Sequence, residues 1–295
     1  MLRKIKFIIL SLLAIVVLWL LWSLFSHQMP WEKNRQTKHQ LKVMTYNTQA
    51  MAIGKDSLKK VEMLKYINLQ DADIVCLQEV LVYKSERRLT LAKLREAMSQ
   101  YPYTYYDFKV YNSKRQFGNV VFSRYPLINK QTVRYQSKSN ISSQCDVVVH
   151  GDTLRLIVNH LESFHLDSDD LNLDSISVSS FQDSPLGKKL IRANSLRRQQ
   201  VSALCKAIRQ SPYPVIAVGD FNSLPISLVY WRLNIGMRDC YAESSFGNYG
   251  CTYSRKGLHA RIDYIFLSRS LYPIQCEVGR KNYSDHYPVI GTFGW

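Results

Sequence analysis

Short apolar segments recur after residue 40, and nearly every one of them is followed by a polar side chain. The polar residues in these positions are Asn47, Glu79, His160, Asp220, Asn222 and Asp263, and Asp285 with His286 directly before the last apolar segment. Taken singly, each has a plainer interpretation as a turn former, a helix cap or a buried polar group. Ligand sites in α/β folds gather at strand ends, so six separate segments ending this way favour one shared cleft.

The segments between these positions alternate between strand and helix patterns. Residues 72–77 form a continuous apolar run, which is typical of a strand buried on both faces. Helical spacing of apolar residues predicts helices over residues 56–69 and 188–209, and a turn at Gly151 predicts a hairpin. Hairpins mixed with crossovers favour a mixed-sheet α/β domain. No repeat and no second linker divides residues 41–295, which we predict to be one domain.

The N-terminal residues indicate an anchor rather than a part of this domain. Residues 7–25 contain no charged side chain, and a helix of that length approaches the roughly 30 Å needed to cross a bilayer core. We predict a basic tail over residues 1–6, one transmembrane helix over residues 7–25 and a tether over residues 26–40. A cleaved signal peptide is the alternative, although its apolar part is usually shorter. The basic tail predicts a single-pass membrane protein with its domain on the extracytoplasmic side.

The net charge and the types of polar residue indicate which partners and which metal ions the protein can bind. The chain has 39 Lys and Arg against 23 Asp and Glu, a net charge of +16 that attracts phosphate-rich partners or anionic surfaces. Its six cysteines show no zinc-binding spacing. Oxygen ligands without thiolate suit Mg²⁺ or Mn²⁺, and Glu79 is the best ligand candidate.

The histidines complete a hydrolytic set. Two of them, His160 and His286, have an acid available to orient them, which suits proton transfer or stabilisation of charge on phosphate. The sequence has no Ser-His or Cys-His nucleophile motif and no P-loop. Metal-assisted attack of water on phosphorus is therefore the predicted reaction.

Seven blocks of sequence resemble, in their order along the chain, the endonuclease/exonuclease/phosphatase superfamily. They are residues 44–47 (MTYN), 75–80 (VCLQEV), 118–126 (GNVVFSRYP), 159–161 (NHL), 218–223 (VGDFNS), 261–265 (RIDYI) and 284–289 (SDHYPV). Any one block is a weak signal, but the ordered set is specific and spans nearly all of the predicted domain. The resemblance implies a four-layer α/β sandwich, in which two mixed β-sheets lie face to face with helices outside. It also implies a divalent-metal hydrolase of phosphodiesters or phosphomonoesters.

The resemblance assigns roles by position to the metal and water sites. It implies that Glu79 binds the metal, helped by Asn47 and by Asp285. Asp220 and Asn222 resemble the pair that handles the attacking water and a phosphate oxygen. Whether Asp220 or a histidine removes the proton from water stays open.

The remaining roles concern the phosphate. Asp263 resembles the carboxylate that orients His286, which in turn contacts the scissile phosphate. His160 is typical of deoxyribonuclease-like enzymes, sphingomyelinases, inositol-polyphosphate phosphatases and tyrosyl-DNA phosphodiesterases rather than of the abasic-site repair branch. Asn119, Asn222 and His160 are the predicted substrate-binding residues.

The predicted function is thus a membrane-anchored, Mg²⁺- or Mn²⁺-dependent phosphoester hydrolase, in the first place a phosphodiesterase acting on a small or lipid phosphoester. The alternative is a nuclease acting on extracytoplasmic nucleic acid. A catalytically inactive module that holds an anionic ligand on the same fold is the rival from a different class. Its expected signature is loss of Glu79, Asp220, Asn222, Asp263 or His286, and the chain has all five. The sequence does not predict an oligomeric state.

Two further segments carry expectations. The insert over residues 163–187 is acidic and rich in serine, and it leaves the strand that ends at His160. We expect it to lie near the mouth of the site and to disfavour long polyanions. Arg197 and Arg198, on the helix predicted over residues 188–209, are expected to face solvent.

Overall fold

The computed structural model describes residues 36–295, together with Ser11 and Ala14, except residues 53–56, 113, 134, 136, 138–139, 165–181, 246–248 and 256. Across these described residues, no helix is both long enough and apolar enough to span a bilayer. Apart from Ser11 and Ala14, the predicted transmembrane helix over residues 7–25 lies outside them, as does most of the insert over residues 163–187.

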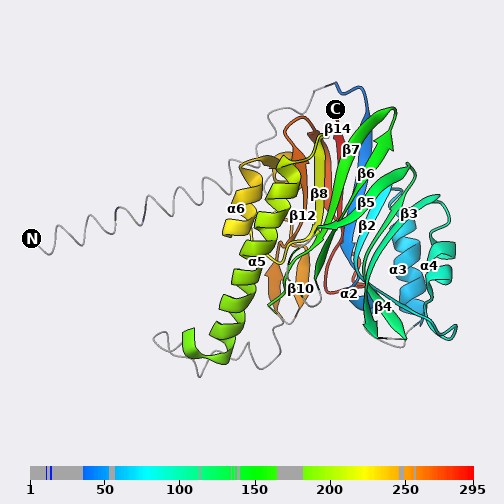
Figure 1. Ribbon diagram of the computed structural model, residues 1–295, viewed down its shortest axis with the longest axis horizontal. Coiled ribbons are helices and arrows are strands. Elements are labelled where there is room, and N and C mark those ends of the chain that lie inside the picture. Colours follow the sequence, from blue (N-terminus) through cyan, green and yellow to red (C-terminus); the bar gives the residue numbers. More distant parts are fainter. Residues whose placement is uncertain are drawn as a thin grey trace, which may run out of the picture.

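Two six-stranded mixed sheets form the centre of the fold (Figure 1). The first has the strand order β13 (Tyr272–Val278), β14 (Val289–Gly294), β1 (Gln40–Asn47), β2 (Ile74–Tyr83), β4 (Arg115–Ser123) and β3 (Tyr103–Asn112). The second has the order β5 (Leu127–Val133), β6 (Ile141–Val149), β7 (Asp152–His160), β8 (Val215–Asp220), β12 (Asp263–Ser268) and β9 (Met237–Asp239). A separate hairpin consists of β10 (Tyr253–Arg255) and β11 (Leu258–Ala260).

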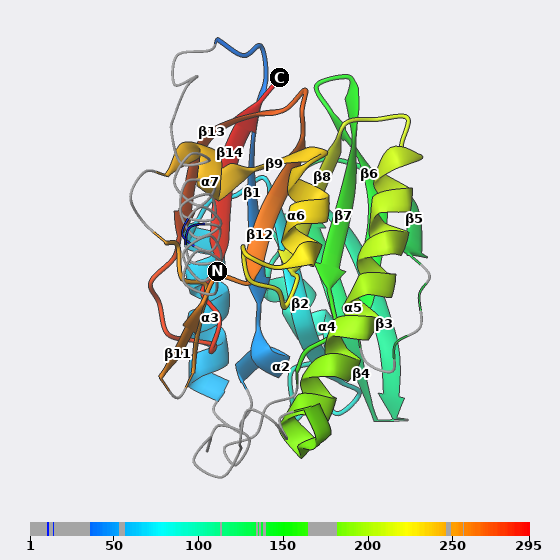
Figure 2. The same cartoon turned by 90° about the vertical axis from the view of Figure 1, so that its left-hand side faces the viewer.

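Helices cover the outer faces of both sheets (Figures 1 and 2). They are α3 (Ser57–Leu69) and α4 (Leu91–Ala97) on the first sheet, and α5 (Pro185–Arg209) and α6 (Leu228–Asn234) on the second. Two shorter helices, α2 (Gln49–Ala52) and α7 (Cys240–Ser244), follow β1 and β9. The predicted architecture of two mixed sheets flanked by helices is confirmed.

Three apolar cores hold these layers together. The central core lies between the sheets and includes Val43 from one and Val218 from the other. A second core lies between α3, α4 and the first sheet, and a third lies beneath α5, where Val201 and Leu204 are buried. Both sheets are therefore covered on both faces, which explains the continuous apolar runs in the sequence.

Strand direction explains why the polar residues meet at one edge. β1 and β2 are parallel, as are β7 and β8, and the register places His160 beside Asp220. Parallel strands run towards the same edge of a sheet, so β1, β7 and β8 deliver their last residues there. Glu79 was predicted to follow the end of its strand, but β2 continues to Tyr83 and presents Glu79 from within the strand. β12 and β14 run antiparallel to β8 and β1, so Asp263 at the start of β12 lies opposite Asp220, and His286 precedes β14 near Asn47.

Gly219 is required for the close approach of β7 and β8 at this edge. Its φ of +127° is disfavoured for other residues, and a Cβ atom at this position would lie 2.0 Å from the carbonyl oxygen of Asn159. Any side chain here would displace Asp220, which follows directly.

Candidate active site

The common edge of the two sheets brings together eight of the nine residues predicted from sequence. Asn47 links the sheets, because its Nδ2 donates hydrogen bonds to Glu79 Oε1 at 3.1 Å and to Asp220 Oδ2 at 3.0 Å. His160 Nε2 lies 3.4 Å from Glu79 Oε1 and 4.0 Å from Asp220 Oδ2. Residues more than 170 positions apart thus share one buried polar cluster.

Glu79 owes its position to an irregularity in β2. The register of β2 against β4 shifts between Leu77 and Val80, and Glu79 has a left-handed φ of 54°. A non-glycine residue in this conformation costs free energy, and such strain is found most often at functional sites. The bulge turns the Glu79 carboxylate towards Asn47 and His160, where its side chain keeps 27% exposure.

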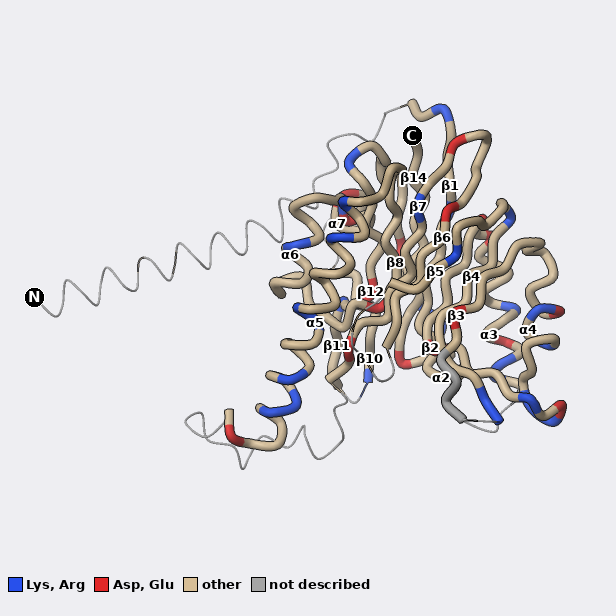
Figure 3. The backbone as a smooth tube through the Cα atoms, viewed as in Figure 1, with Lys and Arg blue, Asp and Glu red and all other residues tan. Residues whose placement is uncertain are grey.

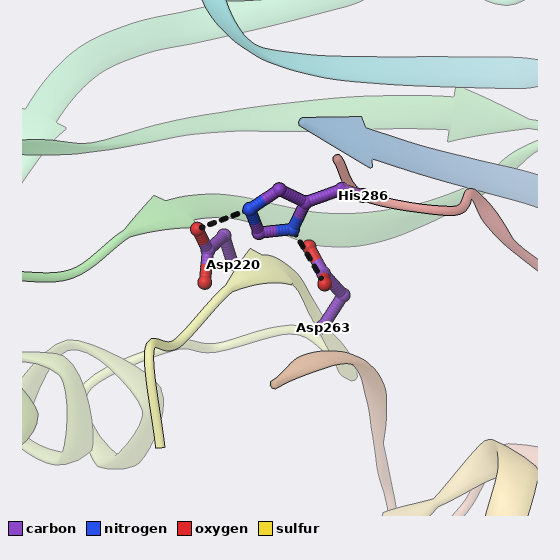
Figure 4. Close-up of side chains that lie close together, drawn as sticks. All are labelled: Asp220, Asp263 and His286. Atoms are coloured by element: carbon purple, nitrogen blue, oxygen red, sulfur yellow. Dashed lines mark hydrogen bonds and ion pairs between the residues drawn. The ribbon is translucent and has the colours of Figure 1, made fainter. Parts of the chain in front are cut away.

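Asp263, His286 and Asp220 form a second, more deeply buried group (Figure 4). The imidazole lies between the two carboxylates, with Nδ1 2.9 Å from Asp263 Oδ2 and Nε2 3.8 Å from Asp220 Oδ2. Their potential ligand atoms all lie within 4.8 Å of one another. Because Asp263 occupies Nδ1, only Nε2 of His286 is directed towards the remainder of the site.

Burial and neighbouring charges raise the pKa values of both His286 and Asp220. Burial opposes the charged form of His286, but Asp263 and Asp220 outweigh it and raise the pKa to about 10. Burial, assisted by the charge of Asp263, raises the pKa of Asp220 to about 6. At neutral pH, His286 is therefore a cationic donor and Asp220 is a carboxylate of unusual basicity.

The residues predicted to bind metal fit a hard divalent cation. Burial and the nearby charge of Glu79 raise the pKa of Asp285, so the two carboxylates repel each other where a cation would neutralise them. Within the described part of the chain, the contacts of Glu79 are made by Oε1, and Oε2 accepts no hydrogen bond. An oxygen-rich donor set of this kind suits Mg²⁺ or Mn²⁺.

Asn222 adopts a left-handed conformation, with φ 47°, directly after β8. Its backbone N–H donates to Asp220 Oδ1 at 2.8 Å, and its side-chain Nδ2 donates to Asp220 Oδ2 at 3.1 Å and to the Leu161 carbonyl at 3.0 Å. Asparagine tolerates this backbone region better than most residues. The Asp220 and Asn222 pair predicted from sequence is thus one hydrogen-bonded unit.

Asn119 is the predicted site residue that the structure places apart from the others. It is buried between the sheets, and its Nδ2 donates to Ser143 Oγ at 3.1 Å and to the carbonyls of Ile141 and Val158. Its Oδ1 is buried without a partner among the described residues. These bonds join β4 to the second sheet, and substrate contact by Asn119 stays a prediction.

Several supporting residues were not predicted from the sequence. Ser284 Oγ donates to the Asn47 carbonyl at 2.9 Å and accepts from the His286 backbone N–H at 3.2 Å. Thr252 Oγ1 accepts from the Asp263 backbone N–H at 3.0 Å, and the Tyr253 ring meets the His286 ring edge-on at 5.0 Å. Ser284 lies inside one of the sequence blocks, whereas Thr252 and Tyr253 have no periodic pattern that marks them.

The expectation for Arg197 was wrong. Arg197 is 1% exposed and points towards the segments that leave β7 and β8, whereas Arg198 is exposed as expected. The guanidinium is held by neutral oxygens and by the Phe164 ring, 3.8 Å away.

The raised pKa of His286 makes the stability of the metal-free protein fall with pH. Its folded-state value of about 10 exceeds the ordinary 6.5, so between these values the folded protein retains a proton that the unfolded chain releases. The stabilisation is complete below about pH 6.5 and is lost as the pH rises towards 10. The pKa of Asp220, raised from 3.8 to about 6, likewise makes the stability fall as the pH rises, but between about pH 3.8 and pH 6.

Urea unfolding with EDTA between pH 6.5 and 9.5 measures this effect. We expect the free energy of unfolding of the unchanged protein to fall by more than about 1 kcal/mol beyond that of His286→Gln, since one pKa unit is worth about 1.4 kcal/mol. His150→Gln is the matched control, because His150 is exposed. Equal slopes in the unchanged protein and His286→Gln would contradict the assignment.

Comparison with solved structures supports the fold. A Beutenbergia cavernae endonuclease/exonuclease/phosphatase is 17% identical, with 87% of this chain and 72% of that chain covered and a TM-score of 0.68. Truncated Caenorhabditis elegans TDP2 is 17% identical, with 88% and 99% covered and a TM-score of 0.62. The human Nocturnin catalytic domain is also 17% identical, with 86% and 94% covered and a TM-score of 0.58.

Sequence comparison adds the family. Curated protein sequences give no significant match. Residues 44–286 match the model of the Endonuclease/Exonuclease/phosphatase family, and these residues include every strand end that contributes to the site. The chain therefore belongs to the endonuclease/exonuclease/phosphatase family.

Proposed function

We propose that the chain is a divalent-metal-dependent hydrolase that directs water at the phosphorus of a phosphoester. Members of this family generally hydrolyse phosphoesters and typically use a divalent metal. The observation that carries the proposal is the position of the Asp263–His286–Asp220 group beside Glu79 and Asn47, at one edge. A cationic donor, a basic carboxylate and an oxygen-rich cation site thereby face the same place.

Glu79, Asn47 and Asp285 would hold Mg²⁺ or Mn²⁺, and the bound ion would supply positive charge that offsets charge developing on the phosphate. His286 is proposed to offset charge on the same phosphate by donating a hydrogen bond. With a pKa raised to about 10 it carries a proton at neutral pH, so its Nε2 donates to a phosphate oxygen rather than removing a proton from water.

Asp220 is our assignment for the general base, the role that the sequence left open between an aspartate and a histidine. Its pKa of about 6 leaves it charged at neutral pH but more basic than an ordinary aspartate. Asn222 fixes both carboxylate oxygens through the bonds at 2.8 Å and 3.1 Å. His160, with Nε2 3.4 Å from Glu79 Oε1, is a second phosphate donor at the same edge.

For the substrate, we propose a small or membrane-borne phosphoester rather than a long nucleic acid. The net charge of +16 attracts phosphates of every kind and does not discriminate. The discrimination is proposed from the acidic insert over residues 163–187, which would repel a long polyanion at the mouth of the site.

Membrane anchoring is part of this proposal and rests on the uncharged residues 7–25 behind Arg3, Lys4 and Lys6. The full chain should sediment with membranes, and a chain beginning at residue 36 should stay in the supernatant. Protease added to intact cells should remove the domain. Sedimentation of both chains with membranes would contradict the anchor, and a domain accessible to protease only after the inner membrane is broken would reverse its orientation.

Hydrolysis of a chromogenic phosphodiester should stop in EDTA and return when Mg²⁺ or Mn²⁺ is restored. The same assay on phospholipid vesicles, inositol phosphates and single-stranded DNA ranks the substrate classes. Preference for DNA would replace the proposed substrate with the nuclease alternative. If no substrate is turned over but anions still bind, the chain is the catalytically inactive binding module instead of a hydrolase.

A further inference from the structure

Arg197 is an exception on its own helix. α5 contains seven Lys and Arg residues and no Asp or Glu, and Figure 3 shows these basic positions along its length. Of the seven, only Arg197 is buried, at 1% exposure. A buried guanidinium requires hydrogen-bond partners, since an unpaired buried charge is strongly unfavourable.

Those partners come from the two segments that leave the parallel strands of the second sheet. Nη1 of Arg197 donates to the carbonyl of Asn222, after β8, and to the carbonyl of Glu162, after β7, at 3.3 Å. Nη2 donates to Asn194 Oδ1 at 2.7 Å. One nitrogen atom therefore bridges the backbones of both segments.

Gln200, one helical turn further along α5, also binds the backbone of Glu162. It is 1% exposed, and its Oε1 accepts from the Glu162 backbone N–H at 2.9 Å. Arg197 and Gln200 together thus bind the carbonyl and the N–H of Glu162. The backbone two residues after His160 is fixed by side chains of α5.

The bridge begins where the β-ladder stops. Among the described residues, the last backbone–backbone hydrogen bond between the two segments joins the Leu161 N–H to the Asp220 carbonyl at 2.9 Å. Beyond it, Asn222 must keep its left-handed φ of 47°, a backbone conformation that is less favourable than the extended or helical regions. The bond from Arg197 to the Asn222 carbonyl favours this conformation, which in turn directs the Asn222 amide at Asp220.

Stability alone does not account for an arginine at this place. Burial lowers the pKa of Arg197 to about 10, although Asp220 and Glu162 oppose the shift. Its hydrogen bonds go to neutral carbonyl and amide oxygens, so the desolvation cost has no direct ion pair to offset it. Replacing buried charge by apolar side chains is often neutral or stabilising, so what distinguishes this arginine is its hydrogen bonding to two separate backbones rather than its charge.

We propose that Arg197, assisted by Gln200, is a positioning residue: it fixes the spacing of the Glu162 and Asn222 backbones and so aligns His160 with Asp220. This inference rests on the proposed phosphoesterase function. Arg197 acts through Asn222 and touches neither substrate nor metal. A displacement of about 1 Å at reacting groups costs on the order of 100-fold in rate.

Three variants of the full chain test the proposal with the chromogenic phosphodiester. Arg197→Met keeps the length of the side chain and removes its donors, and we expect kcat per folded molecule to fall about 100-fold with KM changed less than about threefold. Arg197→Lys should recover at least tenfold of that loss, since an ammonium can donate to both carbonyls. The Nε of Arg197 has no partner among the described residues, so lysine gives up nothing there. Arg198→Met removes an exposed charge one position away and should leave kcat unchanged.

A second pair of variants covers the case in which Arg197→Met does not fold. Gln200→Leu removes the bond to the Glu162 N–H and keeps Arg197, and kcat should fall about tenfold. Gln199→Leu, at an exposed position, is its control and should leave kcat unchanged. Equal kcat in both glutamine variants, with Arg197→Met and Arg197→Lys also equal to each other, would overturn the positioning role.

Hydrogen exchange separates failure of this inference from failure of the proposed function. In Arg197→Met, or in Gln200→Leu if the former does not fold, the backbone amides of residues 161–164 and 220–224 should exchange faster than in the control variant. If the unchanged protein hydrolyses no phosphoester, the proposed function fails, and faster exchange alone then supports the bridge. Unchanged exchange in these segments would overturn the bridge whatever the activity.

Discussion

Glu79→Gln should lower kcat/KM by about three powers of ten, because a metal ion contributes several kcal/mol of charge stabilisation and each 1.36 kcal/mol is a factor of ten. The substitution keeps the shape of the side chain and the acceptor for Asn47 Nδ2, which lies 3.1 Å from Oε1. It removes the negative charge that would hold the cation. Steady-state kinetics across a series of Mg²⁺ and Mn²⁺ concentrations measures the effect, and the apparent affinity for metal should fall with the rate.

Glu243→Gln provides a matched control. Glu243 forms an ion pair with Arg238 away from the site, and its side chain is 27% exposed, the same as that of Glu79. This variant should keep its rate within about twofold, as expected for a change remote from reacting groups. Near-normal turnover of folded Glu79→Gln at ordinary metal concentrations would remove Glu79 from the cation site.

Asp263→Asn should reduce kcat by a factor on the order of 100 to 10,000, the range seen where a histidine loses its orienting carboxylate. The bond from His286 Nδ1 to Asp263 Oδ2, at 2.9 Å, fixes the ring so that Nε2 faces Asp220. Asparagine keeps the size of the side chain but loses the charge that contributes most to raising the pKa of His286. His286 then carries a proton at neutral pH in a smaller fraction of molecules.

The pH profile distinguishes this effect from a loss of folding. In Asp263→Asn, the alkaline limb of kcat should move to lower pH, because the imidazolium releases its proton sooner. Asp146→Asn is the control, since Asp146 is fully buried and paired with Arg155 in β6 and β7, away from the site. A similar fall in kcat per folded molecule in both variants would show that the cost comes from burial rather than from orientation of His286.

The strand-end residues could be predicted because the rule that gathers them is local. An apolar segment followed by a polar residue is visible within a few positions, as at Asn47, Glu79 and Asp220, although Glu79 lies at a bulge within β2 rather than at its end. Parallel pairing then brings these ends to one edge whatever the connections between them. The order of the blocks supplied the rest of the architecture.

Arg197 shows where that reasoning stopped. Its spacing from Ala193, Gln200 and Leu204 follows the buried stripe of α5. A charged side chain is nevertheless expected in solvent, because an unpaired buried charge is unfavourable. The carbonyls that offset the cost of burying this charge belong to two segments distant in sequence, so no local pattern predicts them.

The short strands escaped prediction for a different reason. β9, β10 and β11 have three residues each, too few for an alternating pattern to be recognised. β10 nevertheless places Tyr253 against His286, which lies in the segment before β14, through an isolated β-bridge and a contact between their rings. Such contacts follow from the assembled fold and not from any one segment.

β1 also separates the C-terminus from the catalytic edge. The backbone N–H groups of Lys38 and His39 both donate to the Trp295 carbonyl, so residues 38–39 and the C-terminus lie together where β1 begins (Figure 1). The strand then runs eight residues, about 26 Å at 3.3 Å each, before it delivers Asn47. A bead or fusion partner coupled at the C-terminus would therefore lie at the opposite pole from the reacting groups. A domain immobilised in this way should keep an unobstructed approach for dissolved substrates.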